Sequence, residues 1–513
     1  MQILNIDLTP EQYHVPEELR MAVARKLRLR KEQVGHLQIV KRSLDSRRGQ
    51  VKYSATIQVY NTNEKYIPED FSSPYKEASP QEPIIIVGAG PAGLFAALKA
   101  LEYGMKPIIL ERGKPVEERK RDIALLGREG VVNPDSNWCF GEGGAGTFSD
   151  GKLYTRSTKR GNVGEVLRKF VEHGADPSIM IDAHAHIGTD KLSPIIAKMR
   201  ETIVHYGGEY HFGCSMTDLI VKDGIVQGVV TSDGNSHKGR AVILATGHSA
   251  RDIYELFHHK GWALEAKPFA LGVRVEHPQE LINTIQYHSK NYSSYLPPAS
   301  YTLTTQANGH GVFSFCMCPG GVIVPAATAE RQQVVNGMSN SQRNSAFANS
   351  GIAVTIGWDD IPEYHHYGEM ALLRFQQDVE QKMFDFANGS APSQRLVDFI
   401  DGKASSKLNK SNYLGSCSSA PLQELLPSFV AKSLQQGFVD FDRKMHGFIT
   451  KEASLLAVES RTSSPIRIPR KEDYQHTQLN GLYPCGEGAG YAGGIVSSAL
   501  DGINAVNAIY GKE

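Results

Sequence analysis

Three glycines near residue 90 have the spacing of a phosphate-binding turn. Gly88, Gly90 and Gly93 form a G-x-G-x-x-G pattern between an apolar run at 84–87 and an apolar stretch at 91–103. Such glycines permit a tight turn, let backbone amides approach a pyrophosphate and let the following helix pack on the strand, with its N-terminus facing the phosphates. An acidic residue about twenty positions on can bind ribose hydroxyls. We therefore predict a dinucleotide site, rather than a plain glycine-rich turn, formed by Gly88, Gly90, Pro91, Ala92, Gly93, Glu111 and Arg112.

A second glycine-rich segment, at 481–495, distinguishes the type of dinucleotide. It has the pattern of a strand, a turn and a helix that runs to about Tyr510. An acidic residue after the strand can bond the ribityl chain of a flavin, and the helix start can direct amides at the flavin N1–C2=O edge. A third segment follows the apolar strand 241–244 and crosses near the first turn. Together they predict FAD, bound by Gly486, Glu487, Gly493, Gly494 and Ile495 and by Ala245, Thr246 and Gly247.

The segment 140–152 is too rich in glycine for a helix or strand and too long for a simple turn. We interpret it as a loop against the pyrophosphate and isoalloxazine; the alternative is a flexible surface loop. Its predicted cofactor residues are Gly144, Ala145, Gly146, Thr147 and Lys152.

The residues that react with substrate are less defined, and only weak catalytic candidates stand out. Cys316 and Cys318 alternate on a predicted strand and point to one face. They are either redox thiols or two small packed residues, and residues i and i+2 of an extended strand bridge poorly. Arg461 could clamp a carboxylate or phosphate, or lie in a solvated hinge. Arg274 and His277 are weaker catalytic candidates. His184 and His186 could suggest a metal site, but no further ligands are spaced with them, so we expect no metal.

The order of strand-like and helix-like segments predicts an α/β protein with a Rossmann-type FAD-binding domain and an inserted β-rich α+β domain. A small α/β module, of ferredoxin-like type, precedes them. The expected boundaries are a module at 1–61, a linker at 62–83, the FAD-binding domain at 84–265 and 479–513, and a substrate or cap domain at 266–478.

Composition indicates a soluble cytoplasmic protein. Hydrophobic residues make up 41% and charged residues 21% of 513 residues, and the formal net charge is zero. The N-terminus lacks a secretory pattern, the apolar stretch 83–101 is broken by glycine and proline, and six scattered cysteines do not form a disulfide framework. We expect no membrane partner.

The stretch 20–52 contains eleven basic residues against two acids. This pattern is typical either of a solvated face on a docked module or of a surface for RNA or an acidic protein. No aromatic residues lie between the charges as a stacking set, so we favour the docked module and expect no nucleic-acid partner.

These motifs, with the segments 245–252 and 316–321, resemble the bacterial FAD-dependent dehydrogenase family, whose members are described as NAD(FAD)-utilising or uncharacterised. The resemblance covers the whole chain and implies FAD and a glutathione-reductase-like fold, but no substrate. We expect an FAD-dependent oxidoreductase that transfers a hydride between a small organic substrate and the flavin; the alternative is a flavoprotein that binds RNA or a protein through its basic module. The other G-x-G-x-x-G patterns, at 141–146 and 488–493, lie in the segments that we assign to FAD, so no second fingerprint is left for NAD(P)H. Electrons therefore arrive either from NAD(P)H on the substrate side or from a redox protein partner.

Overall fold

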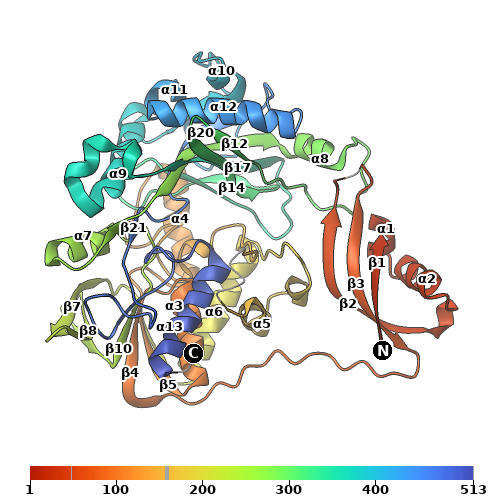
Figure 1. Cartoon of the computed structure of the whole chain (residues 1–513), viewed down its shortest axis with the longest axis horizontal. Coiled ribbons are helices and arrows are strands. Elements are labelled where there is room, and N and C mark those ends of the chain that lie inside the picture. Colours follow the sequence, from red (N-terminus) through yellow and green to blue (C-terminus); the bar gives the residue numbers. More distant parts are fainter. Residues whose placement is uncertain (48, 156–160, 512–513) are drawn as a thin grey trace.

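The computed structural model describes residues 1–47, 49–155 and 161–511. The chain forms three units (Figure 1). We call them the N-terminal module (1–61), the parallel-sheet domain (79–265 and 468–511) and the roof domain (266–467). Among the described residues, every helix is too short or too polar to span a bilayer.

The parallel-sheet domain is a Rossmann-type α/β layer structure. Its five strands, all parallel, lie in the order β22 (Leu482–Pro484), β10 (Ala241–Leu244), β4 (Ser79–Val87), β5 (Met105–Leu110) and β6 (Glu209–His211). Both faces of the sheet are covered, which explains the unbroken apolar run in β4. Ile84 and Ile86 pack under one set of helices, and Ile85 and Val87 face the opposite layer. The first layer contains α3 (Pro91–Glu102), α5 (Val163–Glu172), α6 (Thr189–His205) and α13 (Ile495–Tyr510). The second contains α7 (Arg251–Lys260) and the antiparallel strands β7 (Met216–Lys222), β8 (Ile225–Thr231) and β9 (Ser236–Lys238).

The two helices that begin at the cavity, α3 and α13, pack closely against each other. Gly502 lies so near the Ala92 carbonyl oxygen that a Cβ at Gly502 would overlap it. This close approach lets both helix N-termini reach the same cavity.

The roof domain contains a seven-stranded sheet that lies above the parallel-sheet domain in Figure 1. Its order is β13 (Thr304–Ala307), β14 (His310–Cys318), β17 (Phe347–Ile356), β12 (Phe269–Pro278), β20 (Ser454–Glu459), β18 (Ala391–Arg395) and β19 (Cys417–Ser419). The helices α8 (Gln279–Tyr287), α9 (Ala371–Ala387) and α12 (Ser428–Lys444) pack on the outer face and enclose the largest apolar core. The sequence predicted a β-rich α+β domain with several short strands, and the positions of its two 17-residue helices, α9 and α12, were not predicted.

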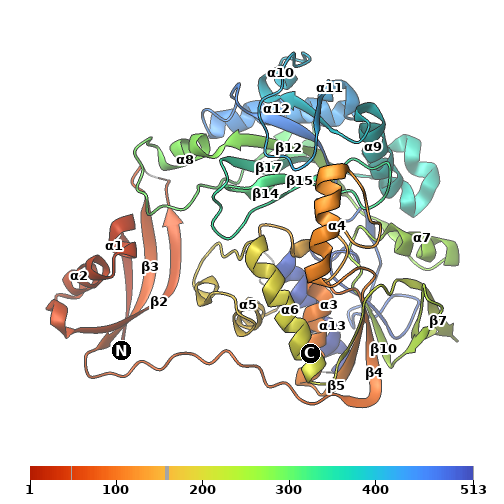
Figure 2. The ribbon, with the colours of Figure 1, turned by 180° about the vertical axis from the view of Figure 1, so that it is seen from behind.

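Two connections join the roof domain to the parallel-sheet domain. The chain enters at β11 (Glu265–Ala266) and leaves at β21 (Ile466–Arg467), and these short strands pair antiparallel. On the other side, α4 (Val116–Glu129) stands against β15 (Val322–Pro325), which pairs with β16 (Val335–Met338) (Figure 2). Ile123 and Trp138 share an apolar cluster with Val324 there. The two domains are therefore held at both edges of the cavity.

The N-terminal module is a three-stranded antiparallel sheet in the order β1 (Gln2–Leu8), β3 (Lys52–Asn61), β2 (Val34–Asp45). Two helices, α1 (Pro10–His14) and α2 (Pro16–Leu27), cover one face. The strand–helix–strand–strand order is the first part of the ferredoxin-like order β-α-β-β-α-β, and the described residues of the module form three strands rather than four. The segment 62–78 links the module to β4 and crosses an open stretch of the molecule in Figure 1.

Candidate flavin site

A cavity of about 1160 Å³ lies between the parallel-sheet domain and the roof domain. This volume exceeds the roughly 300–1,000 Å³ of sites for drug-sized ligands, as a dinucleotide requires. All the predicted cofactor residues line the cavity except Gly93 and Thr147. Segments that are separated by about 400 positions in the chain are therefore brought together, because the strands β4, β10 and β22 end side by side at one edge of the parallel sheet.

The glycine turn after β4 is shaped by contacts that leave no room for side chains. Gly88 has a φ of 103°, and a Cβ there would lie 2.5 Å from the Ala245 carbonyl oxygen. A Cβ at Gly93 would overlap the Gly88 carbonyl oxygen. Gly93 therefore serves the packing of α3 on the turn and lies outside the cavity wall, whereas Gly90, the residue before α3, faces the cavity.

Glu111, at the end of β5, organises the backbone around this turn. Its carboxylate is 4% exposed and accepts hydrogen bonds from the N–H groups of Ala89 (2.8 Å), Gly113 (2.9 Å) and Gly141 (3.0 Å). About one acceptor site, on Oε2, remains, and Glu111 also lines the cavity. The carboxylate thus joins three loops at the predicted ribose position.

The loop 140–152 is ordered from behind by a buried arginine, Arg119 of α4. Its guanidinium donates to the carbonyl oxygens of Asn137 (2.8 Å), Gly141 (3.2 Å) and Gly144 (3.1 Å). Burial lowers the pKa of Arg119 to about 10, against the opposing effect of nearby carboxylates. Thr147 donates to the Glu142 carbonyl oxygen within the loop (3.1 Å). It is fully buried and does not reach the cavity. The alternative of a flexible surface loop does not fit these contacts.

The C-terminal segment presents open backbone to the cavity at the start of α13. A Cβ on Gly493 or Gly494 would meet nothing within 4 Å. Glu487 lines the same wall, with its Oε2 3.6 Å from His248 Nδ1. Behind this wall, Asp501 accepts from the Gly486 N–H (2.7 Å) and from Arg470, and so fixes the turn relative to α13.

Arg461 lines the cavity, but every N–H of its guanidinium already has an acceptor. Nε and Nη2 donate to Glu380 (3.3 and 3.2 Å), Nη2 also to Gln332 (2.8 Å), and Nη1 to Ser249 (3.0 Å) and Thr328 (2.8 Å). Burial works to raise the pKa of Glu380, yet Arg251 and Arg461 lower it to about 2. Arg461 has no free donor for a substrate anion, and the solvated hinge does not fit either, because the side chain is 8% exposed. Its contacts are those of a structural ion-pair network.

The other candidate residues lie in different places. Cys316 lines the cavity from the roof, and Cys318 is fully buried behind it. Arg274 and His277 are fully buried and lie outside the cavity wall. Among the described residues, no cluster of three histidine, cysteine or acidic side chains has the arrangement of a metal site.

The structure adds cavity residues that sequence patterns did not single out. The roof contributes hydroxyl and amide side chains from β13, β14, β16, β17 and the segment just before β13, and the wall beside Glu487 contributes an imidazole, cations and a phenol. These residues are Thr302, Thr304, Thr305, Gln306, Ser314, Thr355, Asn336, His248, Lys267, Arg467 and Tyr491. The alternation in 312–318 indicated one face of a strand but not which domain that face would meet.

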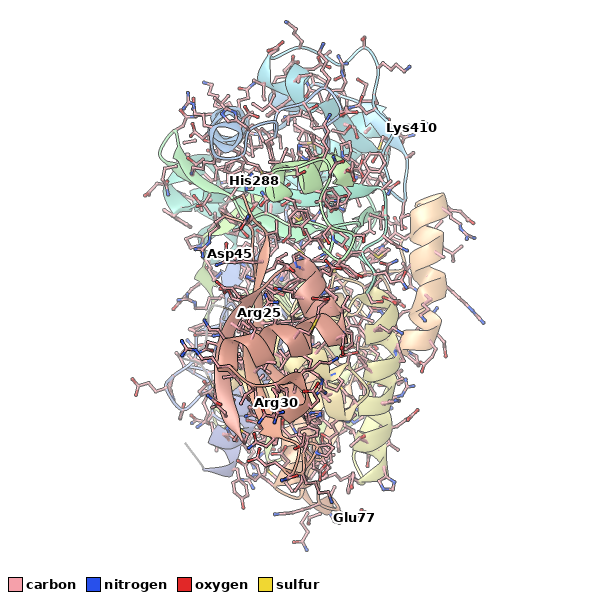
Figure 3. The ribbon with its side chains drawn as sticks, turned by 90° about the vertical axis from the view of Figure 1, so that its right-hand side faces the viewer. Arg25, Arg30, Asp45, Glu77, His288 and Lys410 are labelled. Atoms are coloured by element: carbon pink, nitrogen blue, oxygen red, sulfur yellow. The ribbon has the colours of Figure 1, made fainter. Side chains whose placement is uncertain are left out.

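The basic stretch of the N-terminal module is partly neutralised. Arg42 pairs with Asp182 of the parallel-sheet domain, Lys52 with Asp7, and Arg47 with Asp45. Lys31 pairs with an acid of α2, and Arg20 donates to a backbone carbonyl. The remaining basic positions are Arg25, Lys26, Arg28, Arg30 and Lys41, and Arg48 lies outside the described residues. Arg25 and Arg30 are labelled on the module in Figure 3.

Comparisons with known proteins place the chain in a family. Residues 268–462 match the family described as "FAD-dependent protein, C-terminal domain-like", and residues 1–60 match a domain of unknown function, DUF8436. An uncharacterised protein of Clostridium beijerinckii is 38% identical over 515 residues, covering 96% of each chain. The chain belongs to the same family of FAD-dependent proteins as this relative.

More distant similarities involve flavoproteins and a tRNA-modifying enzyme. The tRNA uridine 5-carboxymethylaminomethyl modification enzyme MnmG of Enterococcus faecalis is 26% identical over 173 residues, or 33% of this chain and 24% of that protein. The crystal structure of CtdE in complex with FAD covers 84% of each chain at 11% identity and a TM-score of 0.34. The flavin-dependent brominase Bmp2 covers 83% of this chain and 78% of its own at 14% identity and a TM-score of 0.35.

Proposed function

We propose that this protein is a cytoplasmic oxidoreductase that binds FAD in the central cavity and transfers a hydride between the flavin and a small organic substrate. The observation that carries this proposal is the single cavity that unites the glycine turn of 88–93, Glu111, the turn 245–247, the loop 144–152 and the start of α13. These segments offer a phosphate cradle, a ribose acceptor and a helix N-terminus in one continuous wall.

The residues fit the two ends of FAD in different ways. Backbone N–H groups at Gly90 and the start of α3 would hold the pyrophosphate, because a helix N-terminus attracts anions. The Glu111 carboxylate would accept from the adenosine ribose. At the other end, Glu487 would bond the ribityl chain and Gly493, Gly494 and Ile495 would direct amides at the flavin ring. Side chains at these two glycines would project into that space.

When bound, FAD supplies the two-electron chemistry, and the protein supplies orientation and charge. The N-terminus of α13, a 16-residue helix, places a positive dipole end where reduction increases negative charge. The hydroxyl and amide groups of the roof, including Thr304, Gln306 and Thr355, give the substrate space polar hydrogen-bonding partners. Val312, Phe313 and Phe315 line the same roof, so this space suits a small molecule with both polar and apolar groups.

The electron donor belongs to the same proposal. Because the G-x-G-x-x-G patterns of the sequence all lie in segments that this proposal gives to FAD, NAD(P)H would approach from the roof side of the cavity, the side that also admits substrate. A redox protein would instead have to place its own cofactor near the cavity mouth. We favour NAD(P)H, since the cavity is large enough for a small donor to enter beside the flavin.

The test starts from the absorption spectrum of the purified protein before and after reconstitution with FAD. We expect the two visible bands of an oxidised flavin, and their bleaching by NADH or NADPH under anaerobic conditions. Protein that shows no flavin bands after reconstitution would refute FAD binding. Flavin that binds but is bleached only by an added reduced redox protein would refute NAD(P)H as donor and leave the oxidoreductase assignment in place. A salt-dependent mobility shift with RNA that disappears on deletion of residues 1–61 would instead support the RNA-binding alternative.

A further inference from the structure

The two cysteines at the end of β14 are brought together by a β-bulge. The strand pairs with β17 at Phe315 opposite Gly351 and again at Cys318 opposite Asn349. Between these two pairs β14 advances by three residues and β17 by two. Cys316 lies in this interval and has a φ of 46°, which is uncommon for a residue with a side chain. Residues i and i+2 of an extended strand are poorly placed to form a disulfide. That limit does not apply at Cys316, because β14 is not extended there.

A buried arginine fixes the bulge from the side of the roof sheet. Arg274 donates to the Cys316 carbonyl oxygen (2.7 Å) and to Asn349 (2.8 Å), and it pairs with Glu459. The Cys318 thiol donates to the same Cys316 carbonyl oxygen at 3.2 Å. The two sulfur atoms therefore lie on one rigid turn rather than on separate mobile loops.

The two thiols differ in access and in ionisation. Cys316 lines the cavity, whereas Cys318 is fully buried behind it. The neighbouring Cys318 side chain lowers the pKa of Cys316 well below its usual value against the effect of burial, and the charges of Lys152 and Arg274 act in the same direction. The same interaction and burial raise the pKa of Cys318. Cys316 at the cavity is thus the more acidic of the two thiols, and Cys318 behind it is the less acidic one.

Lys152 connects this pair to the predicted flavin site. It belongs to the cofactor loop and lines the same cavity as Cys316, Gly146 and Gly493. Its ammonium forms an ion pair with Asp150 Oδ2 at 3.0 Å, and Asp150 is also bound by Arg343 at 2.5 Å. Burial works to lower the pKa of Lys152, but the two cysteines and Asp150 raise it overall, so a positive charge stays beside Cys316.

We propose that Cys316 and Cys318 are a redox couple that exchanges two electrons with the flavin bound in this cavity. The proposal rests on the proposed function. In the oxidising direction an S–S bond forms between the two sulfurs and the Cys318 S–H bond breaks. The two electrons and that proton pass to oxidised flavin, which becomes reduced flavin; the reverse reaction returns both. Cys316 is the cavity-facing thiolate and Cys318 is the buried partner, while Lys152 is a positioning residue that holds positive charge beside Cys316.

The number of electrons that the holoprotein accepts tests this proposal. A dithiol/disulfide couple adds a second two-electron centre, so an anaerobic titration of oxidised wild type should consume about two equivalents of dithionite per flavin rather than about one. Cys316→Ser and Cys318→Ser should each consume about one. Cys417→Ser is the matched control, because Cys417 is a half-buried free thiol of the same sheet, on the edge strand β19, and should leave the uptake at the wild-type value.

Alkylation followed by mass spectrometry gives a second measurement that needs neither variants nor turnover. The peptide that contains both cysteines should resist N-ethylmaleimide in oxidised protein and take up two labels after reduction, in both apoprotein and holoprotein. If wild type consumes only about one equivalent of dithionite and this peptide takes up both N-ethylmaleimide labels before reduction, the redox couple is refuted. The flavin spectrum would still support the proposed function in that case. Protein that binds no flavin would refute the proposed function and the exchange with it, and the labelling would then show separately whether the disulfide forms.

Discussion

Replacement of Glu111 by glutamine isolates the contribution of its carboxylate. The carboxylate holds three backbone N–H groups, two on Oε1 and one, from Ala89, on Oε2. If the amide oxygen takes the position with two donors, the amide NH2 faces the Ala89 N–H and that bond is lost. A hydrogen bond to a charged group contributes about 1.5–3 kcal/mol. We expect Glu111→Gln to reduce the free energy of unfolding by at least that amount, because the opposite amide orientation loses two bonds.

The same substitution should weaken FAD binding, since the carboxylate also faces the predicted ribose. The loss of one charged hydrogen bond to a ligand corresponds to a rise of roughly 10- to 100-fold in Kd. Urea unfolding of apoprotein measures the first effect, and titration of apoprotein with FAD, followed by flavin fluorescence, measures the second. Glu165→Gln is the control, because Glu165 pairs with Lys99 in a partly exposed ion pair whose loss costs about 0–1 kcal/mol.

Two outcomes would refute this reasoning in different ways. Wild-type stability in the glutamine variant would show that the three backbone bonds do not depend on the charge. Reduced stability with an unchanged Kd for FAD would remove Glu111 from the cofactor site and leave it as a support of the loops only.

Three further changes test the packing and the buried charges. Gly502→Ala should lower the free energy of unfolding by about 1–3 kcal/mol, because the new methyl group pushes α13 away from α3. Gly127→Ala is the control: it also lies within a helix, but the nearest atom to its new Cβ is 3.5 Å away, so its stability should be unchanged or slightly higher. Urea unfolding compares the two variants. Burial lowers the pKa of His277 to about 4 from 6.5, so only the unfolded chain binds the proton between these values, and stability should fall by up to roughly 3 kcal/mol from pH 6.5 to 4. His277→Gln should flatten this pH dependence in the same assay. Arg461→Met should cost about 3–5 kcal/mol because Glu380 loses a buried partner; a thermal midpoint unchanged from wild type would contradict that.

The parallel-sheet domain was predictable because its local signals agree with one another. The apolar run of β4, the glycines at 88–93 and the proline that begins α3 all specify a strand, a turn and a helix, and the structure has them in that order. The helix at 192–206 and the final helix were also expected from their apolar patterns, and α6 and α13 occupy these positions. Each of these elements buries a face whose pattern is visible within a few turns of chain.

The roof domain was less predictable because long-range contacts determine its structure. Its central strands β12 and β20 pair across about 180 residues, and no local pattern encodes such partners. The bulge at Cys316 likewise depends on β17 and on the buried Arg274, so the alternation of 312–318 predicted a plain extended strand. Arg461 shows the same limit: its sequence context suggested a ligand clamp or a solvated hinge, but its acceptors come from three distant segments.

The N-terminal module contacts both other domains, and this has a mechanical consequence. Arg42 pairs with Asp182 of the parallel-sheet domain, and the Ser46 carbonyl oxygen accepts from His288 of the roof domain at 2.9 Å. Figure 3 shows His288 directly above Asp45 at the tip of the module. Because the segment 62–78 tethers the module, its docking is intramolecular, and effective concentrations near the millimolar range make even weak contacts sufficient. The docked module thereby bridges the two domains. It opposes a rotation of one domain away from the other, which would change the distance between the floor and the roof of the cavity.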